Sequence, residues 1–298
     1  MSIIKNISII LKPEVINEFN SFLPILTEWL KRRKKNVFFL NDEIPRLKKI
    51  FKDDITHFQL IASKQLYTET DLIISLGGDG TLIGVCRNAV KKAPPIFGIN
   101  MGRLGFITEF SKIDFYDELQ KTIDGTLETV KVPVYSVNVS RNNEKRFKGN
   151  FINDAVFNKI GIARLFTLSV EANGEHVYGI SGDGLIITSP IGSTAYSLAA
   201  GGPIIHPAVS SLTLTPICPH SLSHRPIVMP EYFNIAIRLS SPNENVNLTL
   251  DGQISLPIET EDIVEISYNQ KLFVKLVKNP HRTYFHTLKD KFTHGRRY

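Results

Sequence analysis

Short apolar runs alternate with segments of helical periodicity over the first 124 residues. Four runs rich in Ile, Leu, Val and Phe predict β-strands, at residues 2–11, 37–40, 71–76 and 95–100. Apolar side chains recur every three or four positions in three segments that predict helices, at residues 13–33, 82–90 and 114–123. The mixed, charged segment 41–64 predicts no definite element. This β-α alternation is typical of an open, mostly parallel sheet, so we expect an α/β domain.

The pattern changes near residue 125, where apolar and polar residues begin to alternate. Such runs predict strands at residues 130–132, 135–139, 165–171, 175–178, 233–239, 246–250, 263–266 and 272–277. Helical spacing returns at Phe285, Leu288 and Phe292. We therefore expect an α/β domain at residues 1–124 and a β-rich, sandwich-like domain at residues 125–278. The C-terminal segment 279–298 is expected to return to the first domain with its helix.

A glycine-rich turn joins the third predicted strand to a helix, in the sequence Gly77-Gly78-Asp79-Gly80-Thr81. Such a turn lies at the carboxyl edge of a parallel sheet, where N–H groups at a helix start favour anions. We therefore expect Gly77, Gly78, Gly80 and Thr81 to form a phosphate-binding turn. Asp79 would repel phosphate unless it accepts a proton from a reacting hydroxyl or faces a phosphate-bound cation. Alternatively, Asp-Gly is a common turn pair and Asp79 only shapes the backbone.

Two further stretches offer groups that could contact a ligand. Residues 100–105 follow the next predicted strand and are expected beside the first turn, as a second wall of the site. Residues 192–203 begin with a Gly-Ser-Thr helix start and continue with small residues, which predict a short helix at 195–200. Its N–H donors could meet phosphate or ribose and the Tyr196 ring could stack on a base, or the segment is a tightly packed corner.

Asparagine and aspartate residues at the ends of predicted strands are additional candidates. Asn153 and Asp154 can hold a ribose diol or an adenine edge, although they are also ordinary turn residues. Asp183 and Asp251 each precede a glycine, for which a hairpin turn is the simplest interpretation. Asp183 also precedes an apolar strand that leads into residues 192–203.

Composition narrows the classes of partner. At 298 residues and 42% hydrophobic, the chain can form two domains. A net charge of +6 suits an anionic small molecule and is too modest to indicate nucleic acid. Cys86 and Cys218 lie far apart, the chain start lacks an export signal, and no apolar run is long enough to span a bilayer. We therefore expect a cytoplasmic protein with no nucleic-acid or membrane partner.

Several familiar motifs do not fit. A P-loop needs a lysine that is missing after Gly80, and Ile83 stands where the third glycine of a dinucleotide fingerprint would fall. Asp183 occupies the final glycine position of a nucleophile elbow. No common zinc pattern matches the spacing of His206, Cys218, His220 and His224. We therefore expect no metal site built from protein ligands.

Taken in order, five motifs resemble those of bacterial NAD kinases: Gly77-Gly78-Asp79-Gly80-Thr81, Asn153-Asp154, Asp183-Gly184, the segment 192–203, and Asp251-Gly252-Gln253. The likeness runs from about residue 71 to the carboxyl terminus. The resemblance implies transfer of the γ-phosphoryl group of ATP to the 2′-hydroxyl of the adenosine ribose of NAD, producing NADP, with Mg²⁺ carried by the nucleotide phosphates. It also implies a nucleotide-binding first domain, an NAD-binding second domain, and a homo-oligomer, either a dimer or a tetramer, that serves NADP biosynthesis.

The resemblance assigns roles to individual residues. Asp79 would accept the proton of the attacking hydroxyl, which agrees with the ability of a carboxylate to orient and deprotonate that oxygen. Together with Asp79, the positions implied to contact NAD are Gly80, Asn153, Asp154, Arg164, Asp183, Thr194, Ala195, Tyr196, Ser197, Leu198, Ala199 and Gln253.

Three positions depart from the family pattern. Asp154 stands where Glu is usual, Ser181 where a basic residue is frequent, and Met101 where Arg is common before Gly102. Two rival hypotheses remain beside the NAD kinase. One is a lipid or sugar kinase that shares the Asp79 motif, and the other is a non-catalytic NAD(P)-binding sensor.

Overall fold

The chain divides into two units, of which the first comprises residues 1–132 and 272–298 and the second residues 133–271. The computed structural model describes residues 4–14, 17–126, 128–159, 165–240 and 246–293. Two strands cross the boundary between the units, namely β7 (Thr129–Arg141) and β18 (Asp262–Val277). Each of them covers two of the separate runs that the alternation predicted.

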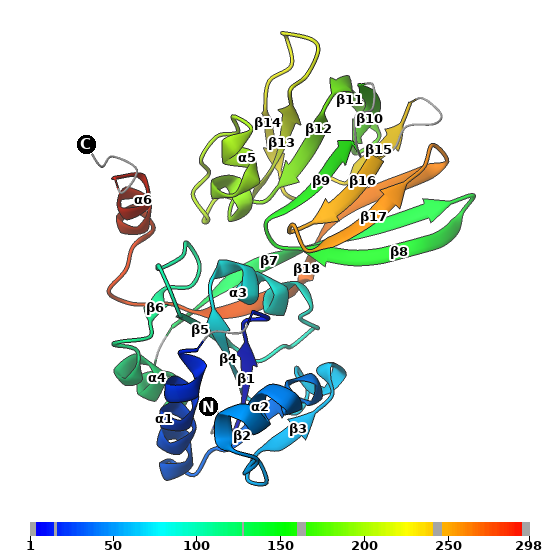
Figure 1. The fold of residues 1–298 in the computed structure, drawn as a ribbon. Helices are drawn as coiled ribbons and strands as arrows, with labels where there is room; N and C mark the ends of the chain where they lie inside the picture. The colour runs from blue at the N-terminus through cyan, green and yellow to red at the C-terminus, as the bar shows by residue number, and fades with distance from the viewer. Residues whose placement is uncertain (1–3, 15–16, 127, 160–164, 241–245, 294–298) are drawn as a thin grey trace. The chain divides into compact units, whose positions relative to one another are not determined.

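A parallel sheet forms the centre of the first unit (Figure 1). Its strands are β1 (Asn6–Leu11), β2 (Asn36–Leu40), β3 (Gln59–Ile61), β4 (Leu72–Gly77), β5 (Ile96–Asn100) and the short β6 (Phe110–Ser111). The order is β3-β2-β1-β4-β5, with β6 and the end of β18 parallel to β5. From β1 the chain builds β2 and β3 on one side and β4 and β5 on the other, so the carboxyl end of β4 lies at a topological switch point.

Helices accompany these strands, and the periodicity predicted all of them except the second. They are α1 (Phe19–Arg32), α2 (Ile44–Phe51), α3 (Asp79–Arg87), α4 (Tyr116–Ile123) and α6 (Tyr284–Thr293). The side chains at positions 19, 23, 26 and 30 of α1 are buried, which is one stripe of a helix that faces the apolar core of this unit. Among the helices of the described residues, none is both long and apolar enough to cross a membrane.

The segment 41–64, which had no clear periodicity, folds into short elements. It contains the 3₁₀ turn η1 (Asn41–Glu43), then α2 and β3, and ends in the 3₁₀ turn η2 (Ser63–Gln65). Of the eight residues of α2, only Leu47 is buried, and Ile50 and Phe51 are partly buried against the core.

The last helix, α6, packs on the first unit, as predicted. Thr287 on this helix is buried, and the Lys291 ammonium lies 5.8 Å from the centre of the Phe106 ring. The C-terminal segment therefore reaches the loop between β5 and β6.

The second unit is a sandwich of two sheets. One contains β14 (Ile227–Pro230), β13 (Ser211–Ile217), β12 (Gly184–Thr188), β9 (Asp154–Lys159), β16 (Val246–Leu250) and β17 (Ile254–Ile258), in that order, with antiparallel neighbours. The other contains β11 (Glu175–Gly182), β10 (Phe166–Ala172), β15 (Ile235–Leu239) and β18, also antiparallel, and the paired β7 and β8 (Glu144–Phe151). Apolar side chains of both sheets form one core, which confirms the sandwich-like class.

Candidate functional site

Asp79 is the first residue of α3, directly after the glycines that end β4. Gly78 is extended, and its carbonyl accepts the N–H groups of Thr81 at 3.1 Å and Leu82 at 3.2 Å. Gly77 pairs in register with Asn100, so the turns that follow β4 and β5 lie side by side at the carboxyl edge of the sheet. The predicted position of the two turns is therefore correct.

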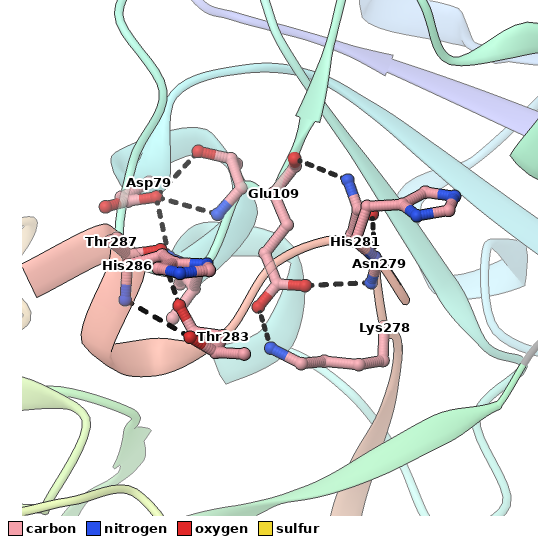
Figure 2. Close-up of polar contacts among 10 residues, drawn as sticks. Asp79, Glu109, Lys278, Asn279, His281, Thr283, His286 and Thr287 are labelled. Carbon is pink, nitrogen blue, oxygen red and sulfur yellow. Dashed lines mark hydrogen bonds and ion pairs between the residues drawn. The ribbon is translucent and has the colours of Figure 1, made fainter. Parts of the chain in front are cut away.

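The carboxylate of Asp79 is held by the loop between β5 and β6 (Figure 2). Its Oδ2 accepts the N–H of Phe106 at 2.7 Å. Its Oδ1 accepts the N–H groups of Ile107 at 3.3 Å and Thr108 at 3.0 Å, and the Thr108 hydroxyl at 2.7 Å. These donors explain how a carboxylate is retained beside a turn that favours anions, because they compensate its charge locally.

Glu109 joins the same loop to the segment after β18 (Figure 2). Its carboxylate pairs with the Lys278 ammonium and accepts the N–H of Asn279 at 2.8 Å. The Asn279 side chain donates to the Glu109 carbonyl at 3.2 Å. The loop that holds Asp79 is thus tied to residues that are 170 positions away in sequence.

Met101, in the neighbouring turn, departs from the family pattern, in which Arg is common at this position. Met101 is buried, and its carbonyl accepts the Lys112 ammonium at 3.3 Å. Arg103 is exposed. The Met101 side chain is therefore part of the packing of the first unit, and a positive charge is available only from Arg103 within this turn.

A cavity of about 410 Å³ lies in the second unit. It is lined by Asn153, Asp154, Val156, Asn158, Ala195, Tyr196, Thr249, Asp251 and Gly252. The Tyr196 side chain is 48% exposed, so its ring is accessible. The Asn153 Oδ1 is buried without a hydrogen-bond partner among the described residues. A buried amide oxygen that lacks a donor is a group that a ligand N–H or O–H can satisfy.

Asp251 fixes the backbone beneath this cavity. It lies in the hairpin turn between β16 and β17, with φ values of +52° at Asp251 and +65° at Gly252. Its carboxylate accepts the N–H groups of Ile152 at 3.1 Å, Asn153 at 2.7 Å and Asp154 at 3.3 Å. The hairpin predicted for Asp251 is confirmed, and the side chain also holds the strand start that carries the Asn153 and Asp154 side chains.

Asp154 has an unusual protonation equilibrium. Burial, followed by the negative charge of Asp251, raises the pKa of its carboxyl from 3.8 to about 7. The side chain therefore changes charge near neutral pH, within a cavity that is otherwise lined by uncharged groups and Asp251.

We expect the Asp154→Asn substitution to stabilise the protein increasingly as the pH rises. Because the folded pKa is raised, the wild-type free energy of unfolding falls between pH 3.8, where the unfolded carboxyl ionises, and about pH 7, and the loss is complete above that. The variant should not show this decrease in the free energy of unfolding, which in the wild type is on the order of 1 kcal/mol or more. Urea unfolding at pH 5 and pH 8 measures it, with the exposed Glu261→Gln as control. A difference between variant and wild type that is independent of pH would contradict this expectation.

The short helix predicted at 195–200 is confirmed except for its end residues, and Gly201, with a φ of +85°, follows it. A 3₁₀ turn, η3 (Gly192–Thr194), and the one-turn helix α5 (Tyr196–Ala199) are separated by Ala195, with φ −95° and ψ −130°. A Cβ atom on Gly192 would lie 2.1 Å from the Asn153 carbonyl oxygen, so the turn packs directly on the Asn153 backbone.

Both interpretations of this segment find support in different residues. Ala195 and Tyr196 line the cavity. The buried Ser197 hydroxyl forms a 2.8 Å hydrogen bond with the Thr215 hydroxyl, so this side chain is engaged within the protein. The segment is therefore a packed corner that presents two of its residues to the cavity.

Asp183 lies between sheets rather than in a hairpin. It connects β11 and β12, which belong to different sheets, so the hairpin interpretation is wrong here. Its carboxylate pairs with the Lys159 ammonium at 2.6 Å. The hydroxyl of Ser181, a position where the family often has a basic residue, lies 2.7 Å from the Thr167 hydroxyl.

Comparison with known proteins gives the family. The ATP-NAD kinase N-terminal domain matches residues 25–127, and the ATP-NAD kinase C-terminal domain matches residues 152–278. An NAD kinase of Solibacter usitatus is 36% identical over 297 residues, with both chains covered completely. The chain belongs to the NAD kinase family. The resemblance seen in its motifs is confirmed, and the family's reaction is the ATP-dependent phosphorylation of NAD to NADP.

Other NAD kinase relatives agree in sequence and fold. An NAD kinase of Geotalea daltonii is 40% identical over 229 residues, 77% of this chain and 80% of that relative. The crystal structure of yeast NADH kinase complexed with NADH covers 100% of this chain and 90% of its own at a TM-score of 0.87 and 24% identity, which shows the fold. An NAD kinase from Archaeoglobus fulgidus in complex with ATP covers 97% of this chain and 98% of its own, at a TM-score of 0.73 and 25% identity.

The structure gathers only part of the predicted NAD-contacting set of this family. Four of its members line the cavity: Asn153, Asp154, Ala195 and Tyr196. Other members lie in the described parts of the chain outside that lining: Asp79, Gly80, Asp183, Thr194, Ser197, Leu198, Ala199 and Gln253. Arg164 lies outside the described residues.

Sequence reasoning missed several residues that hold these groups. Thr108 and Glu109 had no motif around them, and their contacts with Asp79 and Lys278 span long separations in the chain. Val156, Asn158 and Thr249 line the cavity from strands. Asp251 and Gly252, which also line the cavity, did carry a signal, as an Asp-Gly pair. Within the described residues no group of three or more His, Cys, Asp or Glu could hold a metal ion.

Proposed function

We propose that this NAD kinase family member transfers the γ-phosphoryl group of ATP to the 2′-hydroxyl of the adenosine ribose of NAD, with Asp79 as the proton acceptor. The 2′-oxygen forms a bond to the γ-phosphorus, the bond from that phosphorus to the leaving oxygen of ADP breaks, and the hydroxyl proton passes to Asp79. The observation that supports this role is the carboxylate at the start of α3, fixed by loop donors at a switch point of the sheet. Phosphoryl transfer depends on such positioning more than on covalent chemistry by the protein.

The first unit is proposed to bind the nucleotide phosphates. Gly77, Gly78, Gly80 and Thr81 form the turn at the amino end of α3, where the helix dipole favours negative charge. Mg²⁺ is proposed to enter with the phosphates of ATP, because this ion usually keeps water and phosphate oxygens as ligands. When bound, it would neutralise the charge of the phosphates.

The second unit is proposed to bind NAD. The unpartnered Oδ1 of Asn153 can accept a donor from adenine or ribose, and the exposed Tyr196 ring can stack on a base. Asp154, when ionised, can accept from a ribose hydroxyl. The remaining proposed contacts are Gly80, Arg164, Asp183, Thr194, Ala195, Ser197, Leu198, Ala199 and Gln253.

Two properties of the whole protein are also proposed. A cytoplasmic location is supported by two cysteines that are both free. A homo-oligomer, dimer or tetramer, is supported by large apolar side chains exposed on the second unit, such as Leu222 at 88% and Tyr232 at 64%. The protein would then supply NADP in the cytoplasm. Measuring the molecular mass of the protein in solution tests whether it is a dimer or a tetramer.

An assay of acceptors tests the proposed reaction. We expect purified full-length protein with ATP, MgCl₂ and NAD to form NADP, as measured with an NADP-specific dehydrogenase, because the motifs and both matched domains are those of NAD kinases. A lipid and a sugar phosphate are the control acceptors, and they should remain unphosphorylated. Phosphate transfer to either of them without NADP formation would establish another kinase. Binding of NAD without turnover would establish a sensor.

A further inference from the structure

A directional chain of hydrogen bonds ends on the Asp79 carboxylate. The N–H of Gly102 donates to Asn100 Oδ1 at 2.7 Å, and Asn100 Nδ2 donates to the Thr108 hydroxyl oxygen at 2.8 Å. That hydroxyl lies 2.7 Å from Asp79 Oδ1. These hydrogen bonds thus connect the end of β5 with the first residue of α3 through Thr108.

Each direction in this chain follows from the inventory of donors and acceptors. An amide whose oxygen accepts the Gly102 N–H must present its NH₂ group on the other side, toward Thr108. A hydroxyl has a single proton, and an ionised carboxylate can only accept. The Thr108 proton therefore points at Asp79 Oδ1.

The two oxygens of Asp79 are consequently not equivalent. Among the described residues, Oδ1 accepts three donors, the N–H groups of Ile107 and Thr108 and the Thr108 hydroxyl, whereas Oδ2 accepts only the N–H of Phe106. Because a carboxylate oxygen has two lone pairs, Oδ1 is saturated and Oδ2 retains one free acceptor position.

We propose that Asp79 Oδ2 is the oxygen that receives the proton of the substrate hydroxyl, and that Thr108, oriented by Asn100, is the positioning residue that fixes this choice. The inference rests on the proposed role of Asp79. Thr108 has no exposed surface and Asn100 is 3% exposed, so neither side chain is available to a substrate. Both act through the carboxylate.

The loop packs closely against the carboxylate at Gly105. A Cβ atom on Gly105 would lie 1.9 Å from Asp79 Oδ1 and 2.4 Å from the Thr108 hydroxyl oxygen. The absence of a side chain at Gly105 therefore allows the loop to close on Asp79. A carboxylate fixed in this way loses little freedom when the hydroxyl arrives, which is how positioning contributes to rate.

Substitutions at Thr108 test the proposal. Thr108→Val keeps the shape and removes the hydroxyl, and we expect it to lower kcat about tenfold to a hundredfold, with little change in the KM for NAD or ATP. Thr108→Ser keeps the donor and should retain most of the activity. The matched control is Thr122→Val in α4, because the Thr122 hydroxyl is also buried and donates to the Glu118 carbonyl at 2.7 Å, away from Asp79. This control should leave kcat close to that of the wild type.

A double-substitution cycle separates positioning from a general structural effect. In an Asp79→Asn background no carboxylate remains to be positioned, so adding Thr108→Val should cost less than about twofold more. An additional loss as large as in the wild-type background would overturn the proposal, as would full activity of Thr108→Val or equal impairment of Thr108→Ser. If Asp79→Asn itself were fully active, the proposed role of Asp79 would fail instead. If only that variant were impaired, the role of Thr108 alone would fail.

Discussion

Asp79→Asn should lower the kcat for NADP formation about a hundredfold or more, since general bases typically contribute a factor of this size. The amide has nearly the same shape, but it cannot accept a proton, and its NH₂ group would face the N–H donors of Phe106 or Thr108. Initial rates at saturating ATP and NAD measure kcat. The KM for NAD should change much less, because the proposed NAD contacts lie mainly in the second unit.

Asp117→Asn is the matched control for this substitution. Asp117 also lies in the first turn of a helix, α4, and it is exposed. The Asp117→Asn substitution removes one negative charge from the same unit without altering the loop at residues 105–108. The proposed role of Asp79 requires normal activity in the control together with the large loss in Asp79→Asn. Equal rates in the two variants would rule it out.

Asp251→Asn should destabilise the protein and weaken NAD binding together. The carboxylate accepts three backbone N–H groups, and hydrogen bonds to charged groups contribute about 1.5–3 kcal/mol each. An asparagine tolerates the positive φ at this position but can accept with one oxygen only. We therefore expect a loss of about 2–4 kcal/mol in the free energy of unfolding, and a KM for NAD raised about tenfold or more.

The protonation of Asp154 gives a second readout for the same variant. Removing the charge of Asp251 takes away one of the two causes that raise the Asp154 pKa to about 7, so this pKa should move down. The pH dependence of unfolding assigned to Asp154 should then shift to lower pH. Urea unfolding over a pH series measures both effects, with Glu261→Gln as the control for loss of one charge. An unchanged stability and an unchanged KM would show that the hairpin carboxylate does not support the cavity.

The Gly77–Thr81 turn could be predicted because its signals are local. A β-branched run, adjacent glycines and helical spacing follow one another within twenty residues, and they gave β4, α3 and the pairing of β4 with β5. The family resemblance rested on motifs of the same local kind. What the sequence could not indicate is the loop that holds Asp79, since Thr108 lies 29 positions away and carries no pattern of its own.

Residues 192–203 show a different limit. Small residues and a good helix start predicted the short helix at 195–200, which is present as α5, because helix propensity is local information. The packing of Gly192 against the Asn153 backbone could not be predicted from that window, because it is a contact between distant segments. Likewise, the Asp251-Gly252 pair correctly predicted a turn. It did not indicate that the Asp251 carboxylate accepts backbone N–H groups 97 to 99 positions earlier in the chain.

The first unit is assembled from both ends of the chain, and this has a consequence for biosynthesis. The strand segment of β18 that pairs with β5, and the Lys278 and Asn279 contacts that hold Glu109, are made only after the whole second unit has left the ribosome. The loop around Asp79 therefore gains its final anchor among the last steps of synthesis. A chain interrupted before residue 272 would contain Asp79 without the anchor of its loop.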